Sequence, residues 1–185
     1  MADRSILGIC GSLRSKSYNL SALRAAAEEL PPGMTLRIAD YRSIPLFDQD
    51  LESRGVPDAV LQLAQEIRSA DALLIASPEY NFSISGVLKN AIDWMSRQPE
   101  QPFRNKPVAL LSATLGPVGG ARHQYEVRKI LGCLEALVMP RPEVFINLCQ
   151  PKFDADGRLV DAAARKAVAD QMQAFGRWTD RMLAG

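Results

Sequence analysis

Short apolar runs alternate along this chain with longer segments in which apolar residues recur at helical spacing. The unbroken apolar run at residues 72–76 predicts a central strand covered on both faces. Residues 35–39 alternate polar and apolar side chains, which predicts a more exposed outer strand. Further strands are predicted at residues 5–10, at 108–113 and near 143–148. The helical spacing between the strands is carried by Leu20, Leu23, Ala27 and Leu30; by Val60, Leu63, Ala64 and Ile67; by Val87, Leu88, Ala91, Ile92 and Met95; by Val127, Ile130, Leu131 and Leu134; and by Val160, Ala164, Val168, Phe175 and Trp178.

This alternation of strands and helices predicts an α/β fold. Right-handed crossovers between the strands give a doubly wound parallel sheet with helices on both faces. Five strands suit the flavodoxin-like order 2-1-3-4-5 better than the longer dinucleotide-binding fold. We expect a single flavodoxin-like domain over residues 1–185, with ligands bound beyond the carboxyl ends of the strands, after Cys10, Ala76 and Ala113.

Composition narrows the range of functions. The 185 residues carry a formal net charge of +1, with both signs scattered along the chain, so we expect neither a nucleic-acid nor a membrane partner. We expect no signal peptide, and three cysteines at unrelated spacings favour a reducing, cytoplasmic location. Cys10 and Cys133 lie in apolar segments, where each thiol should pack as a small hydrophobic group, whereas the surroundings of Cys149 are left open. With one histidine, no zinc site is expected, and redox chemistry would depend on an organic cofactor.

The segment after the first predicted strand, residues 11–19, has the chemistry of a phosphate-binding loop. Gly11 permits a tight turn, Arg14 offers a fork for phosphate oxygens, and the next helix offers free backbone N–H groups. The segment contains neither the G-x-x-x-x-G-K-[ST] loop nor the G-x-G-x-x-G fingerprint, which favours a monophosphate over a triphosphate. A plainer interpretation is equally open: Ser17 caps the helix, and Arg14 is solvated or serves a neighbouring subunit.

Two further loops follow predicted strands. Residues 77–86 carry two aromatic side chains, of which Tyr80 suits a planar ring, while the backbone of residues 78–81 suits the polar edge of that ring. We interpret Phe82 as packing on this subunit or on a partner. Residues 114–124 contain two adjacent glycines that let the backbone approach a bulky ligand. His123 has no partner in the pattern and is interpreted as a surface helix residue.

Together the three loops resemble those of the NADPH-dependent FMN reductase family, which includes quinone, azo-dye and chromate reductases. Residues 11–19 match the family motif G-S-x-R-x-x-S-x-N, and residues 119–124 are similar to G-G-x-R-x-Q. Residues 78–94 read PEYNFSISGVLKNAIDW and resemble P-E-Y-N-x-S-x-P-G-x-L-K-N-A-I-D-W. Residues 44–51 also resemble the family's loop after the second strand. Ser85 is a departure, because the family usually has proline there, although serine still suits the start of a helix.

The resemblance implies which residues bind the cofactor. The FMN phosphate would be held by Ser12, Arg14, Ser17 and Asn19. The flavin ring and ribityl chain would be surrounded by Pro78, Glu79, Tyr80, Asn81 and Ser83 and, on another side, by residues 112–120, among them Ser112, Gly116, Gly119 and Gly120. In the following helix Lys89 and Asp93 form an i, i+4 pair, and Trp94 packs within the fold or at a dimer contact.

The resemblance also implies an activity, that of an FMN-dependent oxidoreductase. Electrons would pass from NADPH or NADH through bound FMN to a small-molecule acceptor: a quinone, free flavin, an azo compound or a metal oxyanion such as chromate. Because flavin N5 would carry the hydride transfer, no catalytic side chain and no metal are expected. A homodimer or homotetramer is implied, with the flavin near a subunit boundary.

Two other functions of flavodoxin-like proteins fit the sequence less well, and a third stays open. Flavodoxin-like electron carriers resemble one another in being acidic, whereas this chain is near neutral. A signalling receiver domain needs acidic residues after strand 1 and a phospho-acceptor aspartate after strand 3, but residues 10–12 and 77–79 read CGS and SPE. A reductase that releases reduced FMN to a separate monooxygenase stays open, as does the choice between NADPH and NADH.

Overall fold

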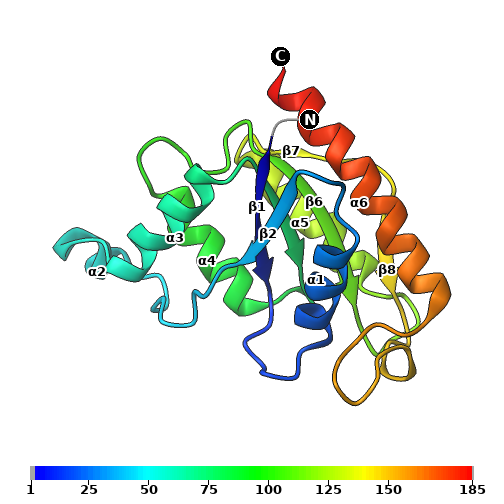
Figure 1. Ribbon diagram of the computed structural model, residues 1–185. Helices are drawn as coiled ribbons and strands as arrows, with labels where there is room; N and C mark the ends of the chain where they lie inside the picture. Colours follow the sequence, from blue (N-terminus) through cyan, green and yellow to red (C-terminus); the bar gives the residue numbers. More distant parts are fainter. Residues whose placement is uncertain (1–2, 185) are drawn as a thin grey trace.

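A parallel sheet organises the chain, and the computed structural model describes residues 3–184 of it, so that Met1, Ala2 and Gly185 lie outside the description (Figure 1). The order is β2-β1-β3-β6-β7, β8 also pairs with β6, and every pair in this sheet is parallel. This confirms the predicted order 2-1-3-4-5, with the fifth strand in two pieces. The strands are β1 (Arg4–Cys10), β2 (Met34–Ile38), β3 (Ala72–Ala76), β6 (Pro107–Ala113), β7 (Leu137–Val138) and β8 (Val144–Ile146).

The break in the fifth strand was not apparent from the sequence, which predicted one strand near residues 143–148. β7 pairs with the start of β6 and β8 with its end, and a segment with a cis Arg141–Pro142 peptide bond lies between the two pieces. The buried Gln171 side chain donates hydrogen bonds to the carbonyl oxygens of Leu110 and Pro142, at 2.9 and 3.0 Å. A side-chain amide thus supplies donors where the strand pairing is interrupted.

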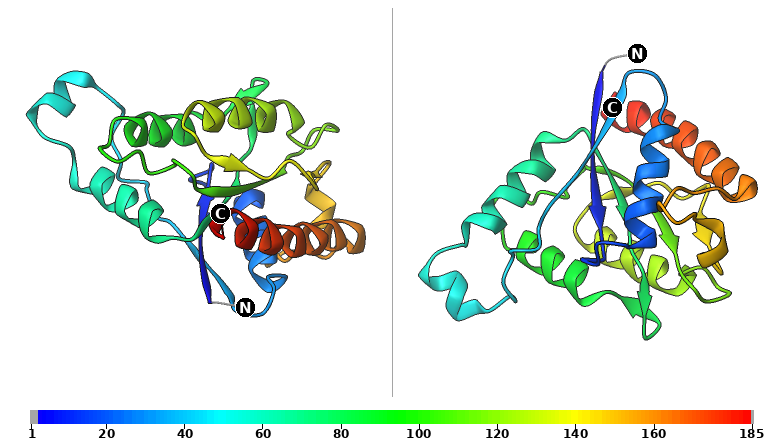
Figure 2. Two further views of the ribbon diagram at one scale, coloured as in Figure 1. Left: turned by 90° about the horizontal axis from the view of Figure 1, so that it is seen from above. Right: turned by 60° about the horizontal axis from the view of Figure 1, so that its bottom comes forward.

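Helices cover both faces of the sheet (Figure 2). One face is covered by α1 (Tyr18–Glu28) and α6 (Ala162–Leu183), and the other by α3 (Asp58–Ser69), α4 (Gly86–Ser96) and α5 (Ala121–Cys133). Strand residues alternate between the two cores: Leu74 lies in the α1 and α6 core, and Leu73 lies in the opposite one. Val160 was predicted to belong to the final helix, but it lies before α6 and is 55% exposed.

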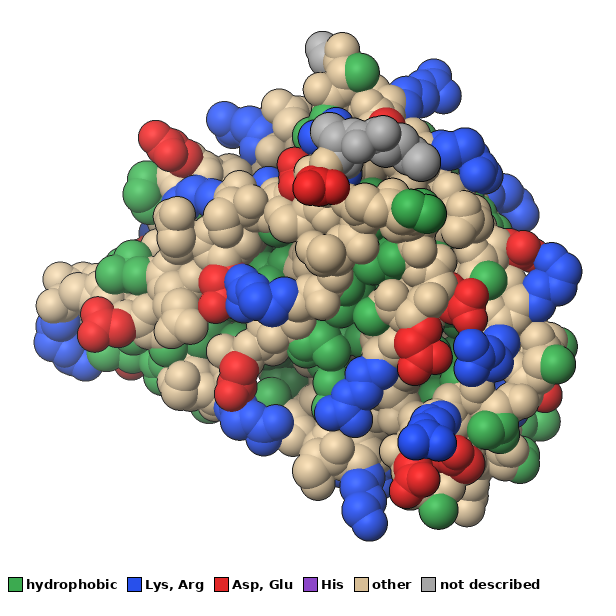
Figure 3. All heavy atoms as spheres, in the orientation of Figure 1, with side chains coloured by type: hydrophobic (Ala, Val, Ile, Leu, Met, Phe, Trp, Pro, Cys, Tyr) green, Lys and Arg blue, Asp and Glu red, His purple; other side chains and the backbone are tan. Residues whose placement is uncertain are grey.

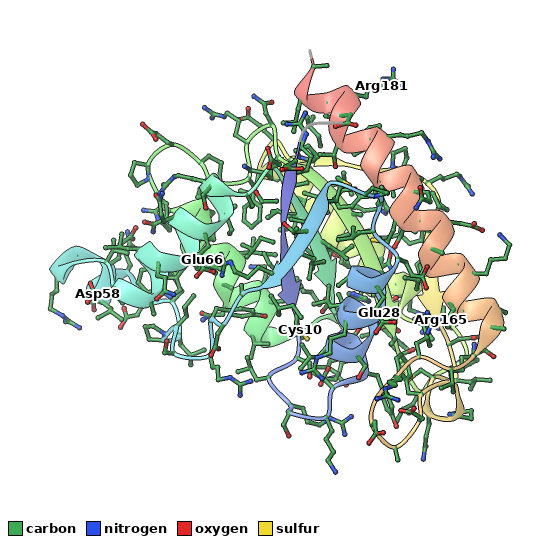
Figure 4. All side chains as sticks on the ribbon, viewed as in Figure 1. Cys10, Glu28, Asp58, Glu66, Arg165 and Arg181 are labelled. Atoms are coloured by element: carbon green, nitrogen blue, oxygen red, sulfur yellow. The ribbon has the colours of Figure 1, made fainter. Side chains whose placement is uncertain are left out.

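Helix α6 is also joined to α1 by charge. Figure 4 labels Arg165 on α6 and Glu28 on α1, which lie side by side. The Arg165 guanidinium is 3.6 Å from the Glu28 carboxylate and 2.8 Å from that of Glu29. These side chains are 26% to 61% exposed, so the two ion pairs add little stability.

Helix α4 holds the long segment that follows β2. The Trp94 indole is fully buried and donates a hydrogen bond to the Pro45 carbonyl at 2.9 Å, and Asn90 donates to the same oxygen at 2.8 Å. Of the two alternatives for Trp94, packing within the fold is therefore confirmed. The Lys89–Asp93 ion pair is also present, at 2.6 Å. Beyond Pro45 the chain continues into the short helix α2 (Gln49–Arg54), which buries none of its residues and projects from the body (Figure 1).

The cysteines are placed differently from the prediction. Cys10 is buried as expected, but Cys133 is exposed because it is the last residue of α5, beyond the packed part of the helix. Cys149, which the pattern left open, is fully buried.

Lys and Arg side chains are interspersed with Asp and Glu over the face of the molecule shown in Figure 3. Within residues 3–184, no helix combines the length and the apolar character that a membrane crossing requires.

Candidate functional site

A cavity of about 600 Å³ lies beyond the carboxyl ends of the central strands. Figure 4 labels Cys10 at the end of β1, where the first loop that lines the cavity begins. The cavity is lined by eight of the predicted site residues, Ser12, Arg14, Ser17, Asn19, Pro78, Glu79, Tyr80 and Gly116, and also by Tyr18, Ala113, Thr114, Leu115 and Gln150. Five predicted residues are not part of the lining: Asn81, Ser83, Ser112, Gly119 and Gly120.

The first loop presents hydroxyl and guanidinium groups at the start of α1. Ser17 is the N-cap of α1, and its buried hydroxyl accepts a hydrogen bond from the Leu20 N–H at 3.4 Å. The exposed Arg14 donates to the Lys16 carbonyl at 2.6 Å, and its guanidinium lies 5.6 Å from the centre of the Tyr18 ring. The loop therefore combines a fixed cation with the positive end of a helix dipole, as an anion site requires.

Asn19 lies deeper than a direct phosphate ligand would need to. It is 3% exposed, and its amide makes two hydrogen bonds of 2.9 Å with the N–H and the C=O of Ala113. Both polar ends of the side chain are thus used to join the start of α1 to the end of β6. Asn19 lines the cavity while it holds two of the loops together.

The loop after β3 forms a small hairpin of β4 (Glu79–Tyr80) and β5 (Ser83–Ile84). At its tip, Asn81 and Phe82 both have left-handed backbone, with φ of 50° and 66°. This conformation is ordinary for asparagine but unusual for a bulky residue such as phenylalanine. The Arg122 guanidinium, 4.2 Å from the centre of the Phe82 ring, provides a compensating cation–π contact.

Glu79 fastens this hairpin to helix α5. The helix begins after Gly120, which has no side chain to cap it. One Glu79 carboxylate oxygen accepts from the N–H groups of Arg122 and His123, at 3.1 and 3.3 Å, and the other accepts from the Arg122 guanidinium at 3.0 Å. Glu79 therefore acts as the cap of α5 and brings a negative charge to its positive end.

The Ser112 hydroxyl and the two glycines serve packing behind the cavity. The Ser112 hydroxyl donates to the Gly119 carbonyl at 2.5 Å and accepts from the Gln124 amide at 2.8 Å. A Cβ at Gly119 would lie 2.8 Å from that of Phe145, and one at Gly120 would lie 2.9 Å from that of Ser112. Both glycines also have positive φ, of 67° and 89°. The close approach that requires glycine here is to the protein's own side chains.

Two buried thiols, Cys10 and Cys149, are not among the residues that line the cavity. The Cys10 thiol donates to the Ser12 carbonyl at 3.4 Å, and burial raises its pKa above the ordinary value. Burial also raises the pKa of Cys149, to about 11. A raised pKa disfavours the thiolate, which is the form in which a thiol acts as a nucleophile.

The expectation that His123 is a surface residue was wrong. His123 is 1% exposed, and its Nδ1 has no hydrogen-bond partner among the described residues. Burial lowers its pKa, while the backbone at Gly120 and the Glu79 carboxylate act in the opposite direction. The ring packs against the backbone turn at Gly120, where a Cβ would lie 3.0 Å from Nδ1.

We expect this buried histidine to make folding stability fall as the pH is lowered. Above the unfolded-state pKa both states hold a neutral ring, so His123 has no effect there. Below that pKa the unfolded chain takes up a proton that the folded chain does not, at a slope of up to about 1.4 kcal/mol per pH unit. Urea unfolding between pH 7 and pH 5 should show a smaller pH dependence for His123→Gln than for the wild type. Equal slopes for the two proteins would contradict the prediction.

Two lining residues were missed by sequence reasoning, and each had a signal. Tyr18 occupies a variable position of the first motif, next to the predicted Ser17 and Asn19. Gln150 follows the last strand, at the same edge of the sheet as the other loops. Because ligands of this fold bind beyond the carboxyl ends of the strands, Gln150 could have been predicted as well.

The donor set fits a monophosphate joined to a planar ring. The lining offers Arg14, two serine hydroxyls and the start of α1, together with Tyr80 and Leu115. Its volume lies in the range of small-molecule sites, roughly 300–1,000 Å³. The fold and this cavity together define a flavodoxin-like protein of the class that binds a phosphorylated planar cofactor.

Comparison with known proteins identifies the family. The family described as NADPH-dependent FMN reductase matches residues 4–150. The chain is 51% identical over 180 residues to an NAD(P)H-dependent FMN reductase of Pseudomonas aeruginosa, with 97% of each chain covered. It is 39% identical to a quinone reductase of Escherichia coli, with 96% of each covered. The chain therefore belongs to the NADPH-dependent FMN reductase family, as its motifs predicted.

Solved structures agree with this assignment. The flavoenzyme NAD(P)H:(acceptor) oxidoreductase FerB of Paracoccus denitrificans superposes with a TM-score of 0.88 at 28% identity, over 97% of this chain and 98% of that one. An FMN-dependent NADH-azoreductase of Bacillus anthracis, solved in complex with FMN, shares the fold at 12% identity with a TM-score of 0.59.

Proposed function

We propose that this protein is an NAD(P)H oxidoreductase that binds FMN in the cavity and transfers electrons from NADPH or NADH to small acceptors. The observation that carries the proposal is that one cavity joins a cationic loop at a helix N-terminus to a loop bearing Tyr80. These two ends match the phosphate and the ring of FMN. Family membership supports the same activity.

Within this proposal the chain's residues bind and orient the cofactor. The phosphate would be held by Ser12, Arg14, Ser17 and the first backbone N–H groups of α1. The ring would lie against the backbone of residues 78–81 and the side chain of Tyr80, with Gly116 on another side. Asn19, Ser112, Gly119 and Gly120 would act by holding these loops in place, and Asn81 and Ser83 by shaping the hairpin.

Bound FMN supplies the redox chemistry, namely hydride acceptance from the nicotinamide and electron delivery to the acceptor. The protein does not need an acid or a base for this. The Glu79 carboxylate is already engaged by α5, and burial raises the pKa of both buried thiols. Tyr80 and Leu115 line the cavity while 54% and 62% exposed, which leaves room for flat acceptors such as quinones.

We further propose a cytoplasmic homodimer or homotetramer with the cavity near a subunit boundary. Phe82, at the tip of the hairpin, is 68% exposed, and Leu46, before α2, is 82% exposed. A second subunit that covers these two apolar side chains would remove them from water.

The experiment that tests the function compares apoprotein with FMN-reconstituted protein in NADPH oxidation with a soluble quinone. We expect negligible oxidation by the apoprotein and sustained oxidation after FMN is added, without any partner reductase. If FMN binds but neither NADPH nor NADH is oxidised, the protein is an electron carrier instead. NADH in place of NADPH gives the preference between the two donors.

A further inference from the structure

Ser85, the residue before α4, uses its hydroxyl in an unexpected way. The residue has the extended backbone of an N-cap, with φ −64° and ψ 143°, but its side chain makes no capping hydrogen bond to α4. Instead its hydroxyl donates to the carbonyl oxygen of Gly11 at 2.6 Å. Ser85 is fully buried, so this bond is shielded from water.

Gly11 is the point at which both ends of the hairpin loop meet the phosphate loop. At the first end, the Gly11 N–H donates to the Ala76 carbonyl at 2.7 Å, and the glycine packs so tightly that a Cβ would lie 2.2 Å from the Ser77 hydroxyl. At the second end, Ser85 binds the Gly11 carbonyl. Residues 77–85 are thus closed at their base onto one residue of the first loop.

We propose that Ser85 is a positioning residue that fixes the distance between the phosphate loop and the ring loop. The inference rests on the proposed function, since it assumes that one FMN molecule spans both loops. Without the hydroxyl, the Gly11 carbonyl is left buried without a donor, and the second end of residues 77–85 is released. Binding of FMN must then bring the two loops back into register, which lowers affinity by loss of preorganisation.

A ligand that lacks the phosphate should not depend on Ser85 to the same extent. Riboflavin has the ring and the ribityl chain of FMN but not its phosphate, so it does not require the two loops to be in register. General damage to the fold would weaken the binding of both ligands, whereas a change in the distance between the two loops would weaken FMN binding selectively. The ratio of the two dissociation constants therefore reports on positioning.

Two substitutions remove the hydroxyl in different ways. Ser85→Ala is the minimal change. Ser85→Pro introduces the residue found in the family motif that residues 78–94 resemble, and the observed φ of −64° suits a proline ring. Ser96→Ala is the matched control, because Ser96, at the other end of α4, donates an equally short hydrogen bond of 2.6 Å to the Asp93 carbonyl but is exposed and remote from the cavity.

The test measures FMN and riboflavin affinity by fluorescence titration of all four apoproteins, with thermal unfolding as the check on folding. For Ser85→Ala we expect FMN affinity to fall roughly fivefold to tenfold relative to riboflavin affinity. Ser85→Pro should lose less, because the proline ring restrains the backbone near the observed φ. Ser96→Ala should match the wild type. An unchanged ratio in folded Ser85→Ala overturns the inference while the proposed function stands. If the wild type binds neither flavin, both proposals fall.

Discussion

Replacing Arg14 by alanine is expected to weaken FMN binding by roughly tenfold to a hundredfold. A hydrogen bond to a charged group contributes about 1.5–3 kcal/mol, and each 1.4 kcal/mol is a factor of about ten in affinity. Arg14 lines the cavity, and its bond to the Lys16 carbonyl directs the guanidinium before any ligand arrives. The loss should appear in a fluorescence titration of apoprotein with FMN.

Two further variants separate the geometry of Arg14 from its charge. Lys16→Ala removes the same charge from an exposed side chain of the same loop that does not line the cavity, so it should leave the affinity nearly unchanged. Arg14→Lys keeps the charge but loses the planar fork, so it should fall between the wild type and Arg14→Ala. Equal FMN affinity for Arg14→Ala and wild type would remove Arg14 from the phosphate site.

Replacing Asn19 by alanine is expected to lower the free energy of unfolding of the apoprotein by about 2–4 kcal/mol. The substitution leaves the N–H and the C=O of Ala113 without their partners in a buried position, and each unpaired buried group costs about 1–3 kcal/mol. Urea unfolding in the absence of FMN measures this directly. Gln62→Ala, which removes an exposed amide from α3, should change stability little.

The aspartate variant adds a second test of the same bonds. Asn19→Asp keeps an acceptor for the Ala113 N–H but faces the Ala113 carbonyl with an oxygen instead of a donor. It should therefore destabilise the apoprotein at least as much as alanine does. If Asn19 acted only by touching the phosphate, neither substitution would change the stability of the apoprotein.

The fold was predictable because its strands differ in their apolar pattern. The unbroken run at Ala72–Ala76 marked the centre of the sheet, and the alternation after Met34 marked its edge. The break between β7 and β8 was not predictable, because the Gln171 donor that stabilises it lies in a helix some 30 residues further along the chain. The short hairpin of β4 and β5 lies in a segment that the sequence pattern indicated only as a loop.

The candidate site was predictable at the level of loops but not of atoms. Local motifs and strand ends located the loops that meet at the cavity. Which side chains face it depends on long-range hydrogen bonds that spacing does not reveal. Asn19 is paired with Ala113, 94 residues away, and Glu79 with Arg122, 43 residues away. His123 was misplaced because its burial depends on how α5 packs, which the local sequence pattern does not show.

FMN binding and its reduction can be measured together in the visible absorption spectrum of the protein after incubation with FMN and desalting, followed by anaerobic addition of NADPH. We expect flavin bands to remain after desalting and to bleach when NADPH is added. A protein that retains no flavin, and binds none in a titration, would contradict this expectation. The three loops would then not form a flavin site, and only the fold would stand.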